Sequence, residues 1–357
     1  MNYSNWWFTK ISDDCKAQSI KALKSNSFTQ GKYTQEAERQ ISNIFKKPVI
    51  FTQNGTNAIL LSLLALDLKE NDEVLVPNFG WIATLQPLVL MGIKFKLIDV
   101  DKKLPNINLL NIKNNISKKT KAIIFVHFHG RMRFIEEISE FCKKKKIFLI
   151  EDSCKAILCK KNGKMAGTYG NFGCFSTGMI SLINSGFGGF IVLNDKKFEK
   201  KIRMMKDHGS DRSNDTYPYL GLNFKTSDIY SSLIINQCKK KNLRAKEKKI
   251  RTIYNLYKKI SNPKVSLMEY DNEEIPICID VISTDILDLR KFLKKNKIPF
   301  CNLHRPFHES KFLGKKFKPT NYKNSKYFFK NCLMLPCGPD QNLILVKKTV
   351  RLINEKF

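Results

Sequence analysis

The chain has few acidic side chains for its size. Among 357 residues, 63 are Lys or Arg and only 32 are Asp or Glu, which gives a formal net charge of +31. A strongly basic protein can bind nucleic acid. Here the lysines are spread through the whole chain, and runs such as 143–146 and 239–241 are typical of solvated helix faces. We therefore expect no nucleic-acid partner, but a basic surface that favours anionic ligands such as nucleotide diphosphates.

Long apolar runs are also missing. No stretch reaches the ~20 apolar residues that cross a bilayer, and the N-terminal MNYSNWWFTKISDDCK lacks the charged-then-apolar order of a signal segment. The ten cysteines form no CxxC pair and no cluster with histidine at zinc spacing. The sequence therefore predicts a soluble, cytoplasmic protein with reduced thiols, no membrane partner and no metal site.

Helix-like and short apolar strand-like segments alternate along most of the chain. Residues 33–46 and 56–68 have helical patterns and 48–53 a strand pattern, and the alternation continues through 72–78, 82–92, 94–101, 121–130, 135–146, 147–154, 173–177 and 188–195. This order predicts an α/β fold with a mostly parallel central sheet and helices on both faces.

The pattern changes at about residue 242. A long basic helix is followed by a strand-like segment at 275–282 and a helix-like segment at 284–296. We predict a large α/β domain at 1–245, with an N-terminal helical segment, and a small C-terminal α/β domain at 246–357.

Ligands of parallel sheets bind at the carboxyl ends of the strands, so the turns there are the candidate site. Gly55 and Thr56 lie at a strand-to-helix turn, where free N–H groups and the helix dipole can hold a phosphate; the same turn also fits an ordinary helix cap. Trp81 follows another strand and either covers a flat ligand or packs in the core. Asn223 precedes a helix start and is, by itself, only part of a capped helix.

Asp152 ends the strand IFLIED. An unpaired carboxylate at the end of a buried strand is costly, so Asp152 needs a cationic partner. A pyridinium nitrogen would serve, because a nearby carboxylate favours the protonated ring. A helix cap is the alternative for this residue.

Together, the segments NGTNA, DEVLVPNFGWIATL, VHFHGR, IEDSCKA, GCFS, SGFGG, DHGS and GLNFKTSD resemble, in this order, the DegT/StrS-type sugar aminotransferases. These are fold type I pyridoxal phosphate (PLP) enzymes of polysaccharide biosynthesis. The resemblance covers nearly the whole chain. It implies a fold type I PLP-transferase, a nucleotide-linked keto-sugar as substrate and glutamate as amino donor.

The resemblance also implies roles for single residues. Gly55, Thr56 and Ser176 would hold the phosphate of PLP or of its amine form, PMP. Trp81 would stack on one face of the pyridine ring, and the small Cys154 would leave room on the other.

Further roles concern the ring nitrogen and a second subunit. Asp152 would pair with the ring nitrogen of the cofactor. Asn223 would reach the cofactor phosphate of a neighbouring subunit, so the resemblance implies a homodimer with shared active sites.

Four residues are candidates for contacts with the substrate. His129 and Arg131, at the end of the strand-like segment 121–130, could face the sugar or its phosphates. His304 and Arg305, in NLHRPFH, are candidates for contact with the diphosphate. Either pair could equally serve the fold or the surface.

The chain departs from the resemblance at Ser181. Relatives have Phe-Ser, four further residues and then a lysine; here Phe175-Ser176 is followed by TGMI and Ser181. That lysine forms an imine with the cofactor and then moves a proton. A serine hydroxyl does neither, so we expect amino transfer to be impaired or altered.

Four explanations stay open at this stage. The serine is an engineered change that traps substrate, or the natural chain binds PLP or PMP without a covalent link, as a PMP-dependent sugar 3-dehydratase would. Alternatively, Lys155 acts as a relocated amine, or the chain is a non-catalytic homologue that binds a nucleotide-sugar or a partner subunit. Retention of Asp152, Trp81 and the other cofactor residues speaks against the last.

Overall fold

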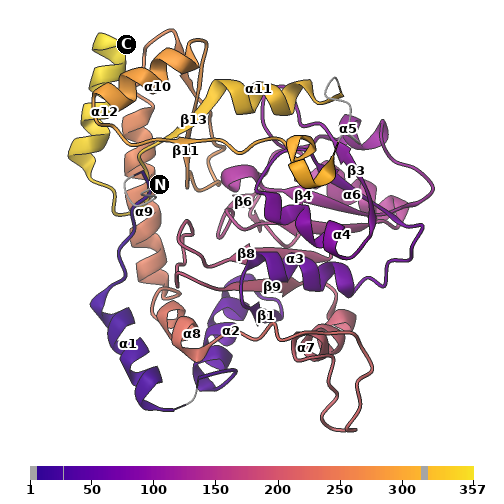
Figure 1. The fold of residues 1–357 in the computed structure, drawn as a ribbon. Coiled ribbons are helices and arrows are strands. Elements are labelled where there is room, and N and C mark those ends of the chain that lie inside the picture. The colour runs from indigo at the N-terminus through magenta and orange to yellow at the C-terminus, as the bar shows by residue number, and fades with distance from the viewer. Residues whose placement is uncertain (1–5, 27, 315–320) are drawn as a thin grey trace.

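A seven-stranded sheet forms the centre of the larger part of the protein (Figure 1). The computed structural model describes residues 6–26, 28–314 and 321–357. Across the sheet the strands follow the order β1-β9-β8-β5-β4-β2-β3. Their bounds are Val49–Thr52 (β1), Glu73–Pro77 (β2), Lys94–Ile98 (β3), Thr120–Val126 (β4), Phe148–Asp152 (β5), Phe172–Ser176 (β8) and Gly189–Leu193 (β9).

Most neighbouring strands in this sheet are parallel. β2 pairs in parallel with β3 and β4, β4 with β5, and β5 with β8. Only β9 runs the other way, antiparallel to both β8 and β1. The mainly parallel sheet expected from the sequence is therefore confirmed. The other six strands have their carboxyl ends at one common edge.

Each strand supplies side chains to two separate cores, because successive side chains of a strand point to opposite faces. In β1, Val49 and Phe51 belong to one hydrophobic cluster and Ile50 to the other. Helices cover both faces, as predicted. The first cluster includes residues of α2 (Lys32–Phe45) and α6 (Ile135–Lys145), and the second includes residues of α3 (Gly55–Leu64), α4 (Gln86–Leu90) and α7 (Glu199–Lys206).

A second sheet of four antiparallel strands lies toward the C-terminus, in the order β10-β11-β13-β12. Its strands are Val265–Leu267 (β10), Ile279–Ser283 (β11), Cys301–Asn302 (β12) and Cys332–Leu335 (β13). The accompanying helices are α10 (Ile286–Lys295), α11 (Lys323–Asn331) and α12 (Leu343–Lys356).

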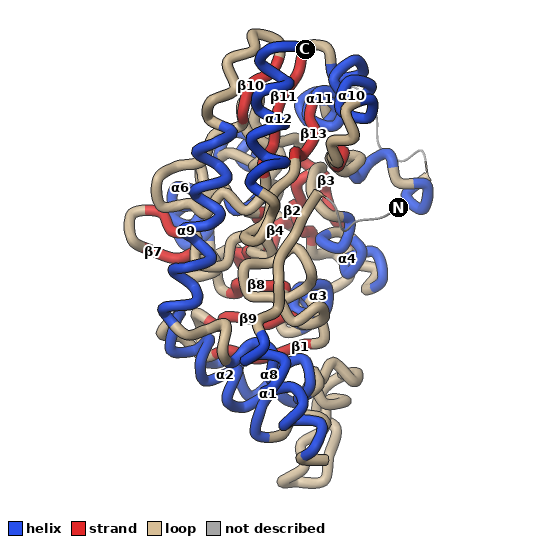
Figure 2. Tube along the Cα trace, turned by 90° about the vertical axis from the view of Figure 1, so that its left-hand side faces the viewer, coloured by secondary structure: helices blue, strands red, loops and turns tan. Residues whose placement is uncertain are grey.

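A long helix connects the two ends of the molecule. Helices α1 (Asp13–Lys24), α2 and α8 (Asp228–Ile235) pack together at one end, and α9 (Lys240–Tyr257) runs from there toward the second sheet (Figures 1 and 2). The predicted domain boundary at 245 falls inside α9, so the helix is continuous across it.

Short elements complete the fold. They are α5 (Leu109–Lys113), the hairpin of β6 (Lys160–Lys161) and β7 (Lys164–Met165), and the 3-10 turns η1 (Ile82–Thr84), η2 (Phe128–Gly130), η3 (Lys196–Phe198), η4 (Phe307–Glu309) and η5 (Lys311–Leu313).

Two prolines explain where the elements differ from the expected segments. The segment 82–92 forms η1 and then the short α4, which has Pro87 in its first turn. The strand expected at 275–282 begins only at Ile279. Pro276 lies in the missing part, and proline has no N–H for a strand ladder.

Two further features concern membrane-spanning helices and cysteines. Among the helices of the described residues, none is both long and apolar enough to cross a membrane. All ten cysteines are free thiols, and eight of them are buried.

Candidate functional site

A cavity of 440 Å³ lies at the edge of the large sheet where the parallel strands have their carboxyl ends. Segments that follow β1, β2, β4, β5 and β8 line it, together with residues of the C-terminal part of the chain. Of the residues singled out from the sequence, those in its lining are Gly55, Thr56, Trp81, His129, Asp152, Cys154, Lys155, Ser176 and His304.

The N-terminus of α3 opens into this cavity. Asn54 caps the helix, since its side chain accepts a hydrogen bond from the Asn57 N–H at 2.9 Å. Within the described residues, the N–H groups of Gly55 and Thr56 have no acceptor. Together with the helix dipole, these free donors can hold an anion such as a phosphate.

Gly55 sits where no larger residue fits. A Cβ atom at this position would lie 2.6 Å from Cys154 Sγ and 3.1 Å from Ser176 Cβ. The three residues therefore pack closely in the cavity lining, and the Ser176 hydroxyl accepts a hydrogen bond from the Gly178 N–H at 3.1 Å.

Asp152 ends β5 and is 7% exposed. Its Oδ2 accepts a hydrogen bond from the Thr84 hydroxyl at 2.6 Å, and its Oδ1 accepts one from the Cys154 N–H at 3.2 Å. Both donors are neutral, and Asp152 forms no ion pair with any described residue. A buried carboxylate without a cation is costly, so this part of the cavity suits a positively charged group.

Trp81 lies at the cavity with 59% of its surface exposed. The His304 ring meets it edge-on, with 4.6 Å between ring centroids. Burial and the charges of His129 and Lys155 lower the pKa of His304 to about 4. His304 is therefore a neutral imidazole near physiological pH, and most of the Trp81 ring is free to cover a ligand.

The β8–β9 loop brings Gly178, Met179 and Ile180 to the cavity. Ser181 itself is 1% exposed, and its hydroxyl donates to the backbone oxygen of Ser176 at 2.7 Å. Its side chain thus does not line the cavity. The hydroxyl serves the loop's own structure.

Lys155 reaches the same loop from the other side. Its amine donates a hydrogen bond to the backbone oxygen of Ile180, at 2.5 Å. Burial lowers the pKa of this amine below its usual value. Lys155, one of the four explanations left open for Ser181, therefore contacts the residue next to that serine in the chain.

His129 and Arg131 are joined to the second sheet through Asp280. His129 Nδ1 lies 2.9 Å from Asp280 Oδ1, and Arg131 Nη1 lies 2.6 Å from Asp280 Oδ2. Arg131 also donates to the backbone oxygens of Glu269 and Met268. Its side chain is fully buried and does not line the cavity.

This finding corrects the role expected for Arg131. A guanidinium with its donors bound to Asp280 and to backbone oxygens links the two sheets, and it does not line the cavity where a contact with the substrate was expected. His129 shares this link but also lines the cavity.

Arg305 and Asn223 lie outside the cavity of their own chain. The Arg305 side chain is 71% exposed and pairs with Glu309 at 3.3 Å. Asn223 is exposed, and its backbone oxygen accepts a hydrogen bond from the Gln53 side chain. Asn223 follows the long loop after α7 that extends away from the large sheet (Figure 1).

Two neighbours of the site were not singled out from the sequence. Thr84 donates to Asp152, and it follows Trp81 by three residues, the spacing that places two side chains on one helix face. Trp6 also lines the cavity, although it is distant in sequence. His127, at the strand end where a ligand was expected, lines the cavity too, with its Nε2 atom 2.8 Å from the buried Glu151.

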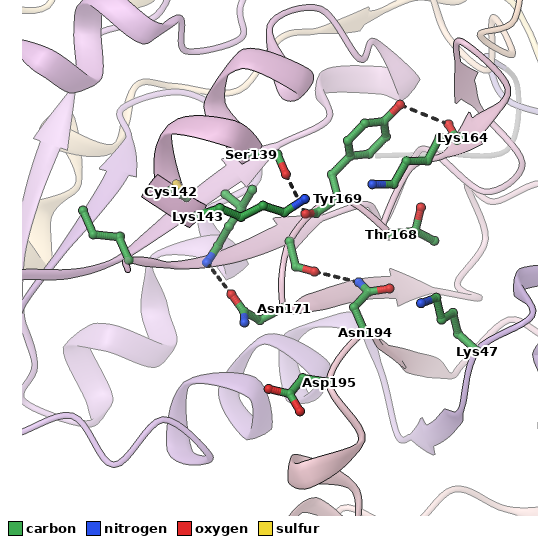
Figure 3. A pocket seen from close by; sticks show the side chains of 13 residues that line it. Lys47, Ser139, Cys142, Lys143, Lys164, Thr168, Tyr169, Asn171, Asn194 and Asp195 are labelled. Atoms are coloured by element: carbon green, nitrogen blue, oxygen red, sulfur yellow. Dashed lines mark hydrogen bonds between the residues drawn. The ribbon is translucent and has the colours of Figure 1, made fainter. Parts of the chain in front are cut away.

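A second cavity of 320 Å³ lies at the opposite edge of the large sheet (Figure 3). Lys47, Lys143 and Lys164 are in its lining. Burial and the charges of Lys143 and Lys47 lower the pKa of Lys164. None of the site residues expected from the sequence lies in this basic pocket. In the described part of the chain, no group of three or more His, Cys, Asp or Glu side chains could hold a metal ion.

Comparison with known proteins gives a family model and relatives that this chain matches. Residues 9–353 match the model of the DegT/DnrJ/EryC1/StrS aminotransferase family. A GDP-4-keto-6-deoxy-D-mannose 3-dehydratase of Yersinia pseudotuberculosis is 33% identical over 54% of this chain and 51% of its own length, so the chain matches about half of that relative. A GDP-perosamine synthase of Escherichia coli O157:H7 is 31% identical over 67% of this chain and 66% of its own.

The fold also matches a solved structure. An aminotransferase of Helicobacter pylori involved in the biosynthesis of pseudoaminic acid superposes with a TM-score of 0.89, covers 99% of both chains and is 22% identical. The α/β architecture, with its mainly parallel central sheet, is thus that of the sugar aminotransferases. From the family match over nearly its whole length, the chain belongs to the DegT/DnrJ/EryC1/StrS aminotransferase family.

Proposed function

We propose that the cavity at the carboxyl ends of the strands binds PLP or PMP, and that the bound cofactor acts on a nucleotide-linked keto-sugar. The observation that carries this proposal is the Asp152 carboxylate, which is buried at the cavity and has no cationic partner among the described residues. A protonated pyridine nitrogen supplies such a partner. PLP provides the chemistry that the protein lacks, since its protonated ring withdraws electrons from a carbon bound through nitrogen.

The residues around Asp152 fit the rest of the cofactor. The free N–H groups of Gly55 and Thr56 and the Ser176 hydroxyl would hold its phosphate. The exposed face of Trp81 would cover the ring, and Cys154 is small enough to leave the opposite side open. Thr84 would keep the Asp152 carboxylate oriented through its 2.6 Å hydrogen bond.

The reaction we propose is amino transfer from glutamate to the keto-sugar, altered in this chain because Ser181 has no amine. The family membership and the sugar-nucleotide names of the two relatives support this class of substrate. The Ser181 side chain is also buried and lies outside the cavity lining, so it is not placed to act as a base on a ligand there.

A PMP-dependent sugar 3-dehydratase is the second candidate. One observation favours it: no amine extends from position 181, as expected of an enzyme that binds PMP without a covalent link. Product analysis separates the two reactions, because a dehydratase removes a sugar hydroxyl, whereas an aminotransferase adds an amine. A non-catalytic nucleotide-sugar-binding homologue would produce neither.

We further propose that the chain acts as a homodimer. Asn223 lies outside its own cavity, beside a loop with highly exposed apolar side chains: Tyr217 is 76% exposed, Leu220 77% and Leu222 59%. Such a patch is typical of a protein interface. A second copy covering it would bring Asn223 to the partner's cofactor phosphate.

The proposed cofactor site is tested by equilibrium dialysis of the purified protein with PLP and with PMP. We expect one molecule to bind per chain, and we expect Asp152→Asn to weaken both, because the neutral amide does not compensate the pyridinium charge. Asp271→Asn, at an exposed carboxylate remote from the cavity, is the matched control. If Asp152→Asn binds both compounds as tightly as the parent protein, the proposed site is wrong.

A further inference from the structure

Among the described residues, Lys155 is the one lysine that lines the cavity at the carboxyl ends of the strands, and no described arginine lines it. It follows β5 and comes three residues after Asp152. The sole primary amine of the cavity is therefore carried by the same turn as the buried carboxylate.

The position of the amine is set by the β8–β9 loop. Lys155 Nζ donates to the oxygen of Ile180, the residue that directly precedes Ser181. The amine thus lies against the part of the loop where the family resemblance expects a lysine, although it comes from a different strand end.

The surroundings of this amine disfavour its charged form relative to a lysine in water. An ammonium group has three N–H donors, and Lys155 has a single acceptor among the described residues. Burial lowers its pKa for the same reason, since a charged amine loses its hydration there. A lowered pKa increases the neutral fraction of this amine, and the neutral amine is the nucleophile.

Ser181 offers no competing group. Its side chain is 1% exposed and its hydroxyl already donates to Ser176. Of the two residues that could replace the family lysine, only Lys155 lines the cavity.

We propose that Lys155 is the catalytic amine of this site and forms the covalent link to PLP. This inference rests on the proposed binding of PLP. The neutral Nζ adds to the aldehyde carbon, a carbon–nitrogen double bond forms, and the aldehyde oxygen leaves as water with the two protons of the amine. No oxidant or reductant takes part in this step.

Borohydride trapping tests the proposal directly. The purified protein is incubated with PLP, reduced with borohydride, digested with trypsin and examined by peptide mass. Trypsin does not cleave after a modified lysine, so a label on Lys155 would appear on the fragment 147–160 instead of 147–155. The absorption spectrum before reduction gives an independent readout.

Two variants make the result specific. Lys155→Arg keeps the cation and a donor for the Ile180 oxygen but cannot form the covalent link. Lys246→Arg is the matched control, because Lys246 is also a partly buried amine that donates to an oxygen of the same loop, that of Leu182, yet it does not line the cavity.

The outcomes separate the two proposals. Lys155 is supported if the label lies on 147–160, falls to background in Lys155→Arg and persists in Lys246→Arg. Reversible binding of PLP with no label, or with label on another lysine, overturns the role of Lys155 but leaves the proposed function standing. Failure to bind PLP or PMP overturns both.

Discussion

The Nδ1 atom of His129 lies 2.9 Å from Oδ1 of Asp280, a residue 151 positions later in the chain. The pair joins the end of β4 to β11 and so connects the two sheets, with Arg131 on the second oxygen of the same carboxylate. Burial alone would favour neutral groups here. Because the Asp280 carboxylate lies between His129 and Arg131, the charged forms are favoured instead. The stability of the fold should therefore depend on the protonation of His129.

We expect the protein to lose stability at alkaline pH through His129. Although burial disfavours its charged form, Asp280 raises the pKa of His129 from 6.5 to about 9. Because the folded-state pKa is the higher one, this contribution is complete below pH 6.5 and is lost as pH rises through about 9. The loss should be on the order of 3 kcal/mol. Urea unfolding between about pH 6 and pH 10 measures this loss. In His129→Gln the free energy of unfolding should change less with pH than in the parent protein. An equal pH dependence in the two proteins would contradict the prediction.

Removing Arg131 should strongly destabilise the fold. Arg131→Met leaves Asp280 buried with His129 as its remaining cation and leaves two backbone oxygens without donors. Loss of one partner of a buried ion pair costs about 3–5 kcal/mol. Urea unfolding measures this loss. Arg305→Met, at a side chain 71% exposed, is the control and should change stability by less than about 0.5 kcal/mol. Similar values for the two variants would show that Arg131 is not a structural link.

Gly55→Ala should destabilise the protein even though alanine is the better helix former. Helix propensity alone would favour alanine by about 1 kcal/mol. The new Cβ, however, would meet Cys154 Sγ at 2.6 Å, and overpacking of this kind costs about 1–3 kcal/mol. Thermal unfolding shows whether Gly55→Ala lowers or raises the stability of the protein. Cys154→Ala in the Gly55→Ala background should restore part of the stability, and no restoration would mean that the contact is not the cause.

Trp81→Ala should weaken cofactor binding without unfolding the protein. Trp81 is 59% exposed, so its removal should change stability by less than about 0.5 kcal/mol. Loss of the ring contact should reduce PLP affinity roughly tenfold. Dialysis and thermal unfolding measure the two effects. Leu90→Ala, at a side chain that is 79% exposed and outside the cavity, should change neither. An unchanged PLP affinity in Trp81→Ala would argue against stacking.

Ser181→Lys should create a second amine at the cavity. The substitution breaks the hydrogen bond to the Ser176 oxygen and releases a long side chain from the loop that already lines the cavity. In the double variant Ser181→Lys/Lys155→Arg, we expect borohydride to trap PLP on residue 181. In Ser181→Lys alone, we expect faster amino transfer from glutamate than in the parent protein. Peptide mass and product analysis measure these outcomes. Absence of label at 181 would show that the loop holds this side chain away from the cofactor.

The site residues that could be predicted from sequence are those at strand ends. Asp152, Gly55 and Trp81 each follow a short apolar strand, and the carboxyl ends of parallel strands share one edge, so local patterns were enough to bring them together. The position of Ser176 followed from the same rule.

The remaining residues depend on contacts between distant segments. Nothing near Arg131 in sequence indicates that its guanidinium binds Asp280, and an arginine at a strand end has the same local pattern whether it faces a ligand or a buried carboxylate. The contact of Lys155 with Ile180 likewise depends on how the β8–β9 loop folds back over the sheet.

The cavity lining has few formal charges, although the whole chain carries +31. Attraction at a distance and retention at the site therefore have separate origins. The basic surface would draw phosphorylated molecules toward the protein through long-range steering, which added salt screens. Under the proposed function, a ligand inside would be held by backbone donors, an aromatic face and one carboxylate, whose short-range contacts are much less sensitive to salt. Ionic strength should consequently govern how fast such ligands arrive and have little influence on how long they stay.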